Sequence, residues 1–327
     1  MGTNVTLADS AQPQIAKWYQ DKKAAISLRF DDAMESHVSF VIPTLNQYGI
    51  KATFMVNPGR EVYQRHKSFW EKDVPAMGHR LGNHTLHHKG ADTVEEADYE
   101  IGEVSRLIWR LYPDSSPLQA FASGGGEKWG GKEWENADKA YKDLVKKYHL
   151  IDLYDGTHHS KAVRSSHTIE QLCEVIEAAV SSNAYQPFHF HNIGSPTLKD
   201  RLEAFLHGSS FTISKSLFLE FIKCLLAKRD QVWIAPIDDI VKYQTEYEAA
   251  TISDIQSNES RLTFRLEVDL DADLYDHVLT LKLPEYLQKA PHYIIQGDHR
   301  IDTITKIGES HLVDIIPVSS IVSIVYD

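Results

Sequence analysis

Cysteine is scarce in this chain, and long hydrophobic runs are absent. The two cysteines, Cys173 and Cys224, both lie in apolar helical patterns. We expect buried free thiols there rather than a disulfide, and the two residues do not fix the redox compartment. Because no run of about eighteen apolar residues occurs, the sequence offers no transmembrane helix.

Positive charge is also in short supply. Lysine and arginine number 34 against 46 aspartates and glutamates, which gives a formal net charge of −12. The chain therefore lacks a basic surface for nucleic acid or anionic lipid, and neutral or cationic substrates suit it better. A hydrophobic content of 42% and a charged content of 24%, without low-complexity tracts, exclude the disordered class.

The first nine residues lack the charged and apolar regions of a secretory signal. An opening Met-Gly-Thr is equally typical of a leader that has been replaced. We expect a secreted, periplasmic or cell-surface protein of a bacterium, and the sequence leaves a cytoplasmic location open.

Short apolar runs alternate with amphipathic stretches over much of the chain, from about residue 24 to residue 243. This rhythm predicts repeated strand–helix units, hence an α/β fold with a parallel sheet or barrel. Two helices show apolar residues at three-and-four spacing, over 101–111 and over 169–179 behind Thr168. The predicted strands are 24–30, 51–56, 149–153, 185–191 and 231–236.

The pattern changes after about residue 248, where apolar and polar residues alternate from Leu262 to Leu270. Period two is typical of a half-buried antiparallel strand. We expect an N-terminal extension (1–23), a (β/α) barrel (24–247) and a small sandwich-like all-β domain (248–327). The β-domain clusters no chemical groups, and a homo-oligomer formed through it is compatible with the sequence. Its further predicted strands are 278–283, 292–295, 301–307, 312–316 and 321–326.

Two adjacent carboxylates, Asp31 and Asp32, directly follow the first predicted strand. A barrel collects its functional groups at the carboxyl ends of its strands. Neighbouring side chains at a strand end point in different directions, so one carboxylate can bind a cation while the other acts as a base. Taken alone, the pair is equally typical of a turn or a helix cap.

Two further segments are rich in histidine. His84 and His88 are four residues apart and would face the same side of a helical turn, where two imidazoles can bind one divalent metal. Together with Asp32 they would leave coordination positions open, as catalytic zinc sites do. His189 and His191 end a predicted strand, and the later residue lies where a general acid is needed.

These segments resemble successive motifs of the polysaccharide deacetylase family, also called carbohydrate esterase family 4 or the NodB-homology domain. The matching stretches are Phe30-Asp31-Asp32, residues 77–88 and residues 188–191, and the resemblance covers about residues 24–243. It implies a distorted (β/α) barrel and metal-dependent removal of acetyl groups from a carbohydrate. Zinc is the expected metal, with cobalt or nickel as alternatives.

The resemblance also implies roles for individual residues. Asp32, His84 and His88 become the metal ligands, Asp31 the general base and His191 the general acid. Thr85 occupies a position that supports the loop between the two histidine ligands.

Two motifs depart from the family pattern. The third normally carries an arginine that orients the catalytic aspartate, but residues 120–127 contain none. We hypothesise that Arg164 takes its place, and that Gly125, within three successive glycines, belongs to a closely approached loop. The fourth motif needs an acid that steadies the catalytic histidine, and Asp152 and Asp155 are the candidates. His158 and His159 are further candidates for lining the site.

Two other functions remain open. Related hydrolases cleave non-peptide C–N bonds in cyclic ureides or imides, and the altered third motif favours considering them. A barrel without activity could instead serve as a carbohydrate-binding protein. The retention of all three expected ligands and both proton-transfer residues argues against that second alternative.

Overall fold

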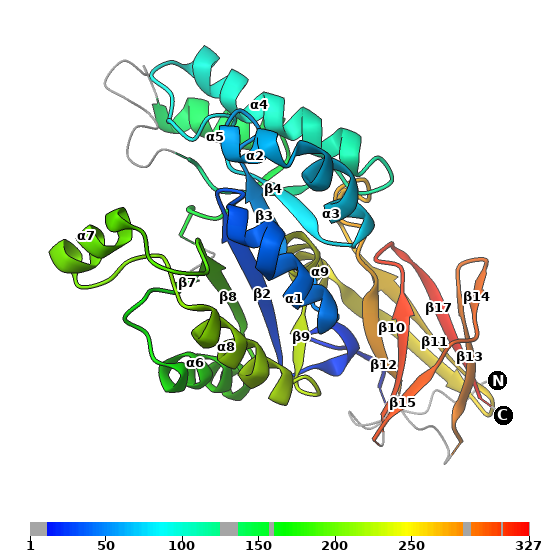
Figure 1. The fold of residues 1–327 in the computed structure, drawn as a ribbon. Coiled ribbons are helices and arrows are strands. Elements are labelled where there is room, and N and C mark those ends of the chain that lie inside the picture. Colours follow the sequence, from blue (N-terminus) through cyan, green and yellow to red (C-terminus); the bar gives the residue numbers. More distant parts are fainter. Residues whose placement is uncertain (1–11, 125–136, 157–159, 284–288, 309, 327) are drawn as a thin grey trace. The chain divides into compact units, whose positions relative to one another are not determined.

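The computed structural model divides into two compact units, one of residues 23–240 and one that joins residues 1–22 to 241–327 (Figure 1). None of its described helices combines the length and apolarity needed to cross a bilayer. The residues that the structure describes are 12–124, 137–156, 160–283, 289–308 and 310–326.

The larger unit alternates strands and helices, as the sequence predicts. Its strands are β2 (Ala24–Asp31), β3 (Thr53–Val56), β4 (Arg80–Asn83), β5 (Gln119–Phe121), β6 (Leu150–Asp152), β7 (Lys161–Ala162), β8 (Tyr185–Phe190) and β9 (Val232–Ile234). Its helices are η3 (His37–Val41), α1 (Ile42–Gln47), α2 (Glu61–Arg65), η4 (Phe69–Asp73), α3 (Val74–Ala76), α4 (Val94–Leu111), α5 (Ala137–Lys147), α6 (Ile169–Ser182), α7 (Leu198–His207) and α8 (Lys215–Ala227).

One parallel sheet organises this unit, in the order β6-β5-β4-β3-β2-β8-β7, with β9 also paired to β2 (Figure 1). Parallel pairing of β2 to β3, β8 and β9 brings the carboxyl ends of the central strands to one edge. This curled sheet confirms the predicted α/β barrel class. β4 and β5 escaped prediction because β4 ends in glycine and asparagine and β5 has only three residues.

The central strand β2 is buried on both faces, and its two faces differ in chemistry. Ala24, Ile26, Leu28 and Phe30 join the hydrophobic core beneath the helices. Phe30 stacks on Phe54 of β3 and on Phe190 of β8, which are its register partners across the sheet. The alternate face carries Ser27, Arg29 and Asp31, because side chains alternate along a strand. Polar groups thus line the inner face.

The two cysteines form a disulfide, so the prediction of free thiols is wrong. Cys173 lies on α6 and Cys224 on α8, and their Cα atoms are 6.0 Å apart, within the range for a disulfide. The apolar helical patterns were interpreted correctly, but they cannot reveal that α6 and α8 pack together. Both cysteines are half-buried rather than buried.

Two antiparallel sheets make up most of the other unit, in the orders β1-β12-β16-β15 and β10-β11-β17-β13-β14. Helix α9 (Ile237–Ala249) runs across the boundary between the units. The remaining elements are β1 (Gln14–Ile15), η2 (Tyr19–Asp21), β10 (Thr251–Asn258), β11 (Arg261–Glu267), β12 (Leu279–Leu283), β13 (Pro291–Gln296), β14 (His299–Ile301), β15 (Thr305–Ile307), β16 (Ser310–Ile315) and β17 (Ser320–Tyr326).

Three details of this unit differ from expectation. The expected N-terminal extension contains β1, which pairs with β12. The predicted strand 301–307 is instead two strands, β14 and β15, which belong to different sheets. Strand β10 escaped prediction because a bulge at Asp254, whose φ is 52°, shifts its apolar residues out of period two.

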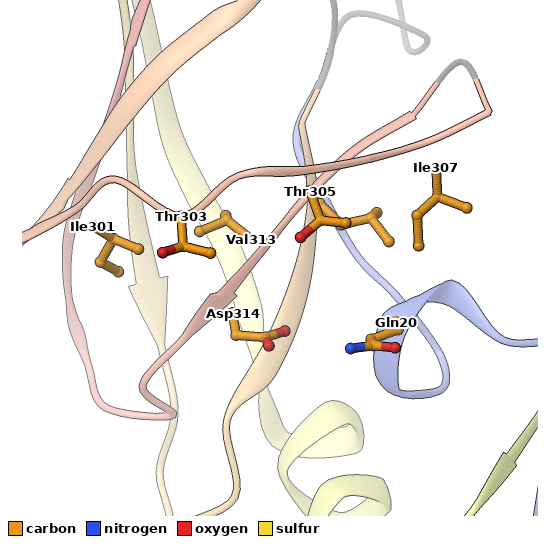
Figure 2. A pocket seen from close by; sticks show the side chains of 8 residues that line it. Gln20, Ile301, Thr303, Thr305, Ile307, Val313 and Asp314 are labelled. Atoms are coloured by element: carbon orange, nitrogen blue, oxygen red, sulfur yellow. The ribbon is translucent and has the colours of Figure 1, made fainter.

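A small cavity of about 170 Å³ opens in this unit (Figure 2). Asp314 lies at its base, where it accepts hydrogen bonds from the hydroxyls of Tyr19 (3.0 Å) and Thr280 (2.8 Å). Among the described residues, the lining combines a few polar side chains with Ile301, Ile307 and Val313. The Asp314 carboxylate already accepts these two hydrogen bonds, and we assign this cavity no chemistry.

Candidate metal centre and proton-transfer site

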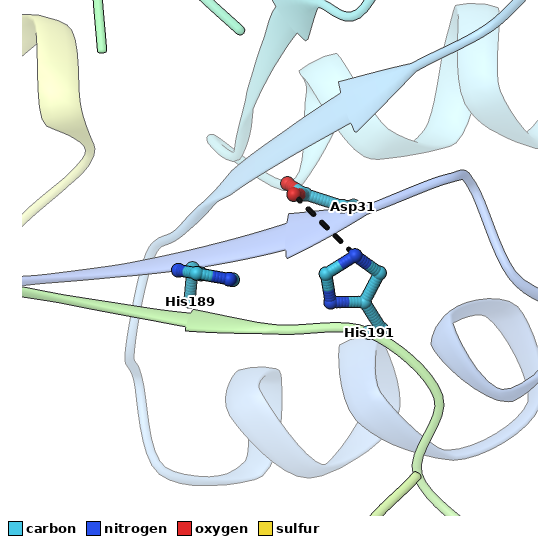
Figure 3. Close-up of side chains that lie close together, drawn as sticks. All are labelled: Asp31, His189 and His191. Carbon is cyan, nitrogen blue, oxygen red and sulfur yellow. Dashed lines mark ion pairs between the residues drawn. The ribbon is translucent and has the colours of Figure 1, made fainter. Parts of the chain in front are cut away.

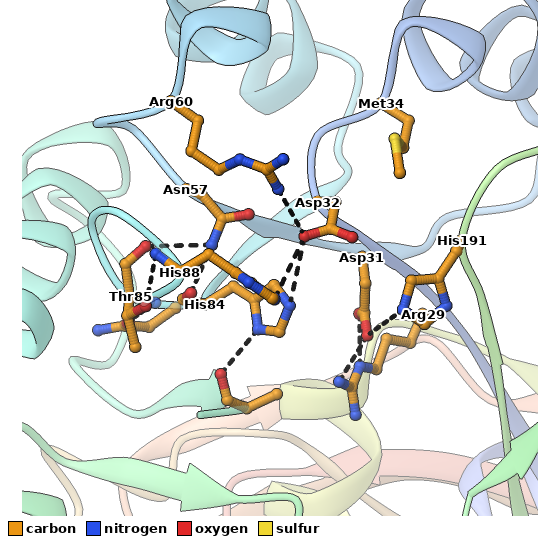
Figure 4. Close-up of polar contacts among 12 residues, drawn as sticks. Arg29, Asp31, Asp32, Met34, Asn57, Arg60, His84, Thr85, His88 and His191 are labelled. Carbon is orange, nitrogen blue, oxygen red and sulfur yellow. Dashed lines mark hydrogen bonds and ion pairs between the residues drawn. The ribbon is translucent and has the colours of Figure 1, made fainter. Parts of the chain in front are cut away.

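The two adjacent carboxylates end up on different sides of the chain, as expected at a strand end. Asp31 is the last residue of β2, and its side chain is only 2% exposed. Asp32 and Ala33 adopt left-handed conformations, with φ of 75° and 47°. This turn directs the Asp32 carboxylate away from that of Asp31 and toward the segment after β4 (Figure 4).

His84 and His88 meet, although not on a helical turn. The segment after β4 is a loop in which Thr85 and His88 have φ of 66° and 58°. The two imidazole rings lie 4.7 Å apart, edge to face. The predicted proximity of the rings therefore holds, but the helical geometry behind it is wrong, because two left-handed residues bend the loop back on itself.

Asp32, His84 and His88 form a compact group of three donor atoms. Asp32 Oδ1 lies 3.4 Å from His88 Nε2 and 3.8 Å from His84 Nε2 (Figure 4). Tetrahedral zinc with bonds of about 2.05 Å would place its ligand atoms about 3.3 Å apart, so small adjustments suffice. One carboxylate and two imidazoles are a suitable donor set for a catalytic divalent metal.

The protonation of His84 also suits a ligand. Its Nδ1 lies 2.8 Å from the carbonyl oxygen of Ala122, so Nδ1 donates and the lone pair of Nε2 faces Asp32. Burial lowers the pKa of His84, while the charges of Asp31 and Asp32 partly oppose that effect. A neutral imidazole is the form that binds a metal.

Asn57 and Glu100, which the sequence did not single out, hold this loop together with the expected Thr85. Asn57, just after β3, donates from its amide to the carbonyls of His84 and Thr85. Thr85 Oγ1 accepts from the backbone N–H of His88 at 3.2 Å. Glu100 of α4 accepts from the ring and backbone nitrogens of His87. Asn57 had a usable signal, because it is a polar residue directly behind a buried strand.

Gly124 packs against the same loop. A Cβ at this position would lie 2.7 Å from His84 O and 2.7 Å from Thr85 Oγ1, closer than real contacts allow. Glycine is therefore required by close approach of the backbone. The predicted Gly125 lies outside the described residues, as do His158 and His159.

Arg60 borders the centre from α2's amino-terminal side. Its Nη1 donates to Asp32 Oδ1 at 3.0 Å, and its side chain is 40% exposed. This contact uses the carboxylate oxygen nearest the two imidazoles, so Arg60 would share or exchange that oxygen when a cation is held there.

The Arg29 guanidinium forms an ion pair with the carboxylate of Asp31. Its Nε and Nη2 donate to the two carboxylate oxygens at 2.6 and 2.7 Å. Burial alone would raise the pKa of Asp31, but Arg29, with smaller contributions from His84 and His191, holds it well below its usual range. The hypothesis that Arg164 fills this role is wrong, because the Arg164 guanidinium lies 3.9 Å from the centre of the Phe211 ring.

His191 lies directly after β8, and its Nε2 is 3.9 Å from Asp31 Oδ2. The backbone carbonyl of His191 accepts from Nε2 of His37, while Nδ1 of His37 accepts from Met34 N. The buried imidazole of His37 thus links the segment after β2 to the segment after β8 by hydrogen bonds. Its tautomer is fixed by these two bonds, and burial lowers its pKa to about 4.

The fourth motif is expected to supply a carboxylate beside His191, from Asp152 or Asp155. Asp152 accepts from the backbone of Tyr154 and from the hydroxyl of Tyr141, and Asp155 lies exposed on the same loop. Among the described residues, Nδ1 of His191 has no hydrogen-bond partner. Asp152 is therefore engaged away from His191, and within the described part of the chain no carboxylate is hydrogen-bonded to Nδ1 of His191.

A second group of donor atoms comprises Asp31, His189 and His191 (Figure 3). It suits a cation less well than the first group does. Arg29 already donates to both oxygens of Asp31, and Nδ1 of His189 is hydrogen-bonded to Ser160. Burial also lowers the pKa of His189 to about 4. These contacts leave the group less free to hold a cation than the group of Asp32, His84 and His88.

A cavity of about 440 Å³ adjoins both groups, since Asp32 and His191 line it. Met34 and Phe211 contribute apolar surface, and Asp200 and Glu203 contribute carboxylates near α7. A ligand in this cavity would therefore reach the candidate metal ligands and the imidazole of His191 together.

The fold and the site define an α/β barrel with a candidate metal centre at the carboxyl ends of its strands. Comparison with known families places it further, because residues 19–125 match the family model for polysaccharide deacetylases. This match spans about a third of the chain, and it confirms the resemblance to polysaccharide deacetylases that the first two motifs show.

Individual relatives are distant. A gellan lyase from a Bacillus species is 24% identical over 285 residues, which cover 83% of this chain but only 11% of that protein. A chitin deacetylase from Colletotrichum lindemuthianum is 17% identical, with a TM-score of 0.42 and coverage of 67% of this chain and 87% of its own. A pseudoenzyme of carbohydrate esterase family 4 from Bacillus anthracis is 12% identical, with a TM-score of 0.41 and coverages of 68% and 66%.

Proposed function

We propose that this chain is a metal-dependent hydrolase that removes N- or O-acetyl groups from a polysaccharide or oligosaccharide. One observation carries the proposal. A carboxylate and two imidazoles converge from segments more than fifty residues apart, with Asp32 Oδ1 lying 3.4 and 3.8 Å from the two ring nitrogens. A second carboxylate and a third imidazole, Asp31 and His191, lie beside them at the same cavity.

Asp32, His84 and His88 would hold the metal. Zinc is our first choice, with cobalt and nickel as alternatives, because two imidazoles and one carboxylate leave positions open. When bound, the ion lowers the pKa of water toward about 7 and polarises an acetyl carbonyl.

The proton transfers fall to Asp31 and His191. Asp31 is held as a carboxylate by Arg29, so it can accept a proton from the attacking water. His191 can donate a proton to the departing sugar nitrogen or oxygen, and its Nε2 faces Asp31 across 3.9 Å. The products are acetate and a free amine or hydroxyl.

The substrate is proposed to be an acetylated carbohydrate. The net charge of −12 argues against nucleic acid and anionic membranes as partners. The gellan lyase relative is named for a polysaccharide, but the small share of it that this chain matches makes gellan only one member of a substrate panel.

The decisive experiment combines elemental analysis with acetate release from acetylated xylan, chitooligosaccharides, acetylated gellan and an aryl acetate. We expect about one divalent metal per chain and acetate release that a chelator abolishes. The His84→Ala variant is the matched control, because it should lose both. Ureide turnover without acetate release would favour the C–N hydrolase alternative. Absence of bound metal and of hydrolysis, even after zinc, cobalt or nickel is added, would favour a carbohydrate-binding role.

We further propose that the protein functions outside the bacterial cytoplasm. The disulfide between α6 and α8 supports this location, because disulfides persist mainly in oxidising compartments. Self-association through the β-domain remains a proposal, and sedimentation analysis of the purified chain would test it.

A further inference from the structure

We propose that Arg29 is the positioning residue of the Asp31 carboxylate and that Tyr154 braces its outer end. This pair would replace the arginine that the third motif lacks. The inference rests on the proposed function, in which Asp31 accepts a proton. It states that Asp31 is oriented for this role by a residue of its own strand, β2.

Arg29 and Asp31 form a bidentate ion pair. Arg29 Nε lies 2.6 Å from one oxygen of Asp31, and Nη2 lies 2.7 Å from the other. Two parallel bonds from a planar guanidinium fix both the distance and the plane of a carboxylate. The Arg29 and Asp31 side chains are 1% and 2% exposed, so water does not compete for these bonds.

Both residues of this ion pair come from the same strand, β2. Arg29 and Asp31 are two residues apart on β2, so both side chains point to the inner face of the sheet. β2 is held by β3 and β8 along this stretch, which leaves the two Cα atoms little freedom. The orientation of Asp31 therefore depends on one rigid strand and needs no support from the loop after β5.

Other arginines near the site are engaged elsewhere. Arg164 lies over the ring of Phe211, and Arg60 contacts Asp32. A buried carboxylate requires a partner, and a buried guanidinium equally requires an anion. Arg29 and Asp31 satisfy each other, which explains how the chain dispenses with the family's third-motif arginine.

Tyr154 completes the arrangement. Its hydroxyl lies 3.1 Å from Nη2 of Arg29, and its ring centre lies 5.4 Å from the guanidinium carbon. The residue comes from the loop after β6, where the family's fourth motif supports the catalytic histidine. Here the same loop contacts the partner of the base instead. Tyr154 is 55% exposed, so it limits movement of Arg29 from the solvent side.

Four variants of the full chain test the proposal, with acetate release and bound metal measured for each. Arg29→Met should lower kcat about 100-fold while KM and metal content stay near wild type, because supporting contacts of a site are worth about 10- to 100-fold. Arg29→Lys should recover part of the loss, since one donor remains. Tyr154→Phe should lower kcat about threefold, because the hydrogen bond that it removes is at a 55% exposed residue and acts on Arg29 rather than directly on Asp31. Arg164→Ala is the matched control and should stay within about twofold.

A kcat of Arg29→Met within twofold of wild type, in a folded protein with metal bound, would overturn the proposal. So would a larger kcat loss in Arg164→Ala than in Arg29→Lys. If Arg29→Met does not fold, Arg29→Lys and Tyr154→Phe decide by the same measurements. Crystal structures of wild type and Arg29→Lys distinguish a failure of the proposed function from a failure of the positioning role. The Asp31 carboxylate should rotate in the variant even if no acetylated substrate is hydrolysed, and an unmoved carboxylate would reject the positioning role.

Discussion

The two halves of the candidate site differ in how their side chains are held. On the metal side, Asp32, His84 and His88 follow strand ends, and His84 is fixed by contacts from neighbouring loops, through Asn57 and the Ala122 carbonyl. On the proton-transfer side, residues 120–127 contain no arginine to orient Asp31. Asp31 is held from within its own strand, and Nδ1 of His191 has no partner among the described residues.

This difference shows what a short motif can specify. Groups that touch the reaction must occupy particular strand ends, so their spacing is retained. Groups that only hold them can come from any element on the same face, provided the geometry is equivalent. The metal half of the site should therefore behave as the family pattern implies, whereas the proton-transfer half should respond to residues outside that pattern.

The largest expected effects separate the two halves directly. His84→Ala removes one of three proposed ligands and should abolish both metal binding and turnover. Asp31→Asn should retain the metal while kcat falls about 10²- to 10⁴-fold, the usual contribution of a general base. Elemental analysis and acetate release measure both effects. His299→Ala, on an exposed strand of the β-domain, is the control and should change neither. The reverse pattern for His84 and Asp31 would exchange their roles.

The disulfide should stabilise the scaffold behind His191, because α6 packs against β8. Closing a loop between residues 51 apart in sequence removes chain entropy worth about 4 kcal/mol. The Cys173→Ala/Cys224→Ala double variant should lose about that much free energy of unfolding in denaturant titrations while it keeps its metal. Adding a reductant should destabilise wild type equally and leave the double variant unchanged. Two reactive thiols in the native protein would contradict the disulfide.

His37 should make the proton-transfer half sensitive to acid. Burial lowers its pKa from 6.5 to about 4, so the folded protein favours the neutral ring. Above pH 6.5 both folded and unfolded forms are neutral, and the contribution is complete. As pH falls from 6.5 to 4, the unfolded chain takes up a proton that the folded chain refuses, which lowers the free energy of unfolding by about 3 kcal/mol.

Unfolding titrations between pH 8 and pH 4 measure this loss. His37→Gln removes the titrating group and retains a donor for the His191 carbonyl. Its stability should therefore fall less steeply over this interval than that of wild type. The comparison at pH 8, where the ring is neutral in both states, isolates the cost of the substitution itself. Parallel curves for the two proteins would exclude His37 as a source of acid sensitivity.

Much of the barrel could be predicted from the sequence, because its main strands and helices have strong periodicity. The strand over 24–30 and the helix capped by Thr168 occur as expected, and the capping box of α6 is complete. Contacts between elements could not be predicted in this way. The Cys173–Cys224 bond depends on which faces of α6 and α8 meet, and periodicity contains no information about that choice.

The same limit applies within the site. Asp31, Asp32, His84, His88 and His191 were all found from motifs, and the structure brings them together. Arg29 is not part of any motif, although its spacing of two from Asp31 on a strand is a usable signal. Only their position in the chain predicts Asp152 and Asp155 as supports of His191, and the direction in which a loop turns its side chains is set by tertiary contacts.

The smallest effect concerns Thr85, which supports the metal half through one hydrogen bond. Its Oγ1 accepts from the backbone N–H of His88 at 3.2 Å, and the side chain is buried. Thr85→Val keeps the shape but removes the acceptor, at a cost of about 1 kcal/mol, or about a fivefold weaker metal affinity. Competition with a chelator measures that affinity, and Thr85→Ser, which keeps the acceptor, should bind metal as wild type does. Because the contact acts on a ligand and not on Asp31 or His191, kcat of the metal-saturated Thr85→Val protein should stay close to wild type. A fall in kcat at saturating metal would show that the two halves are coupled through this loop.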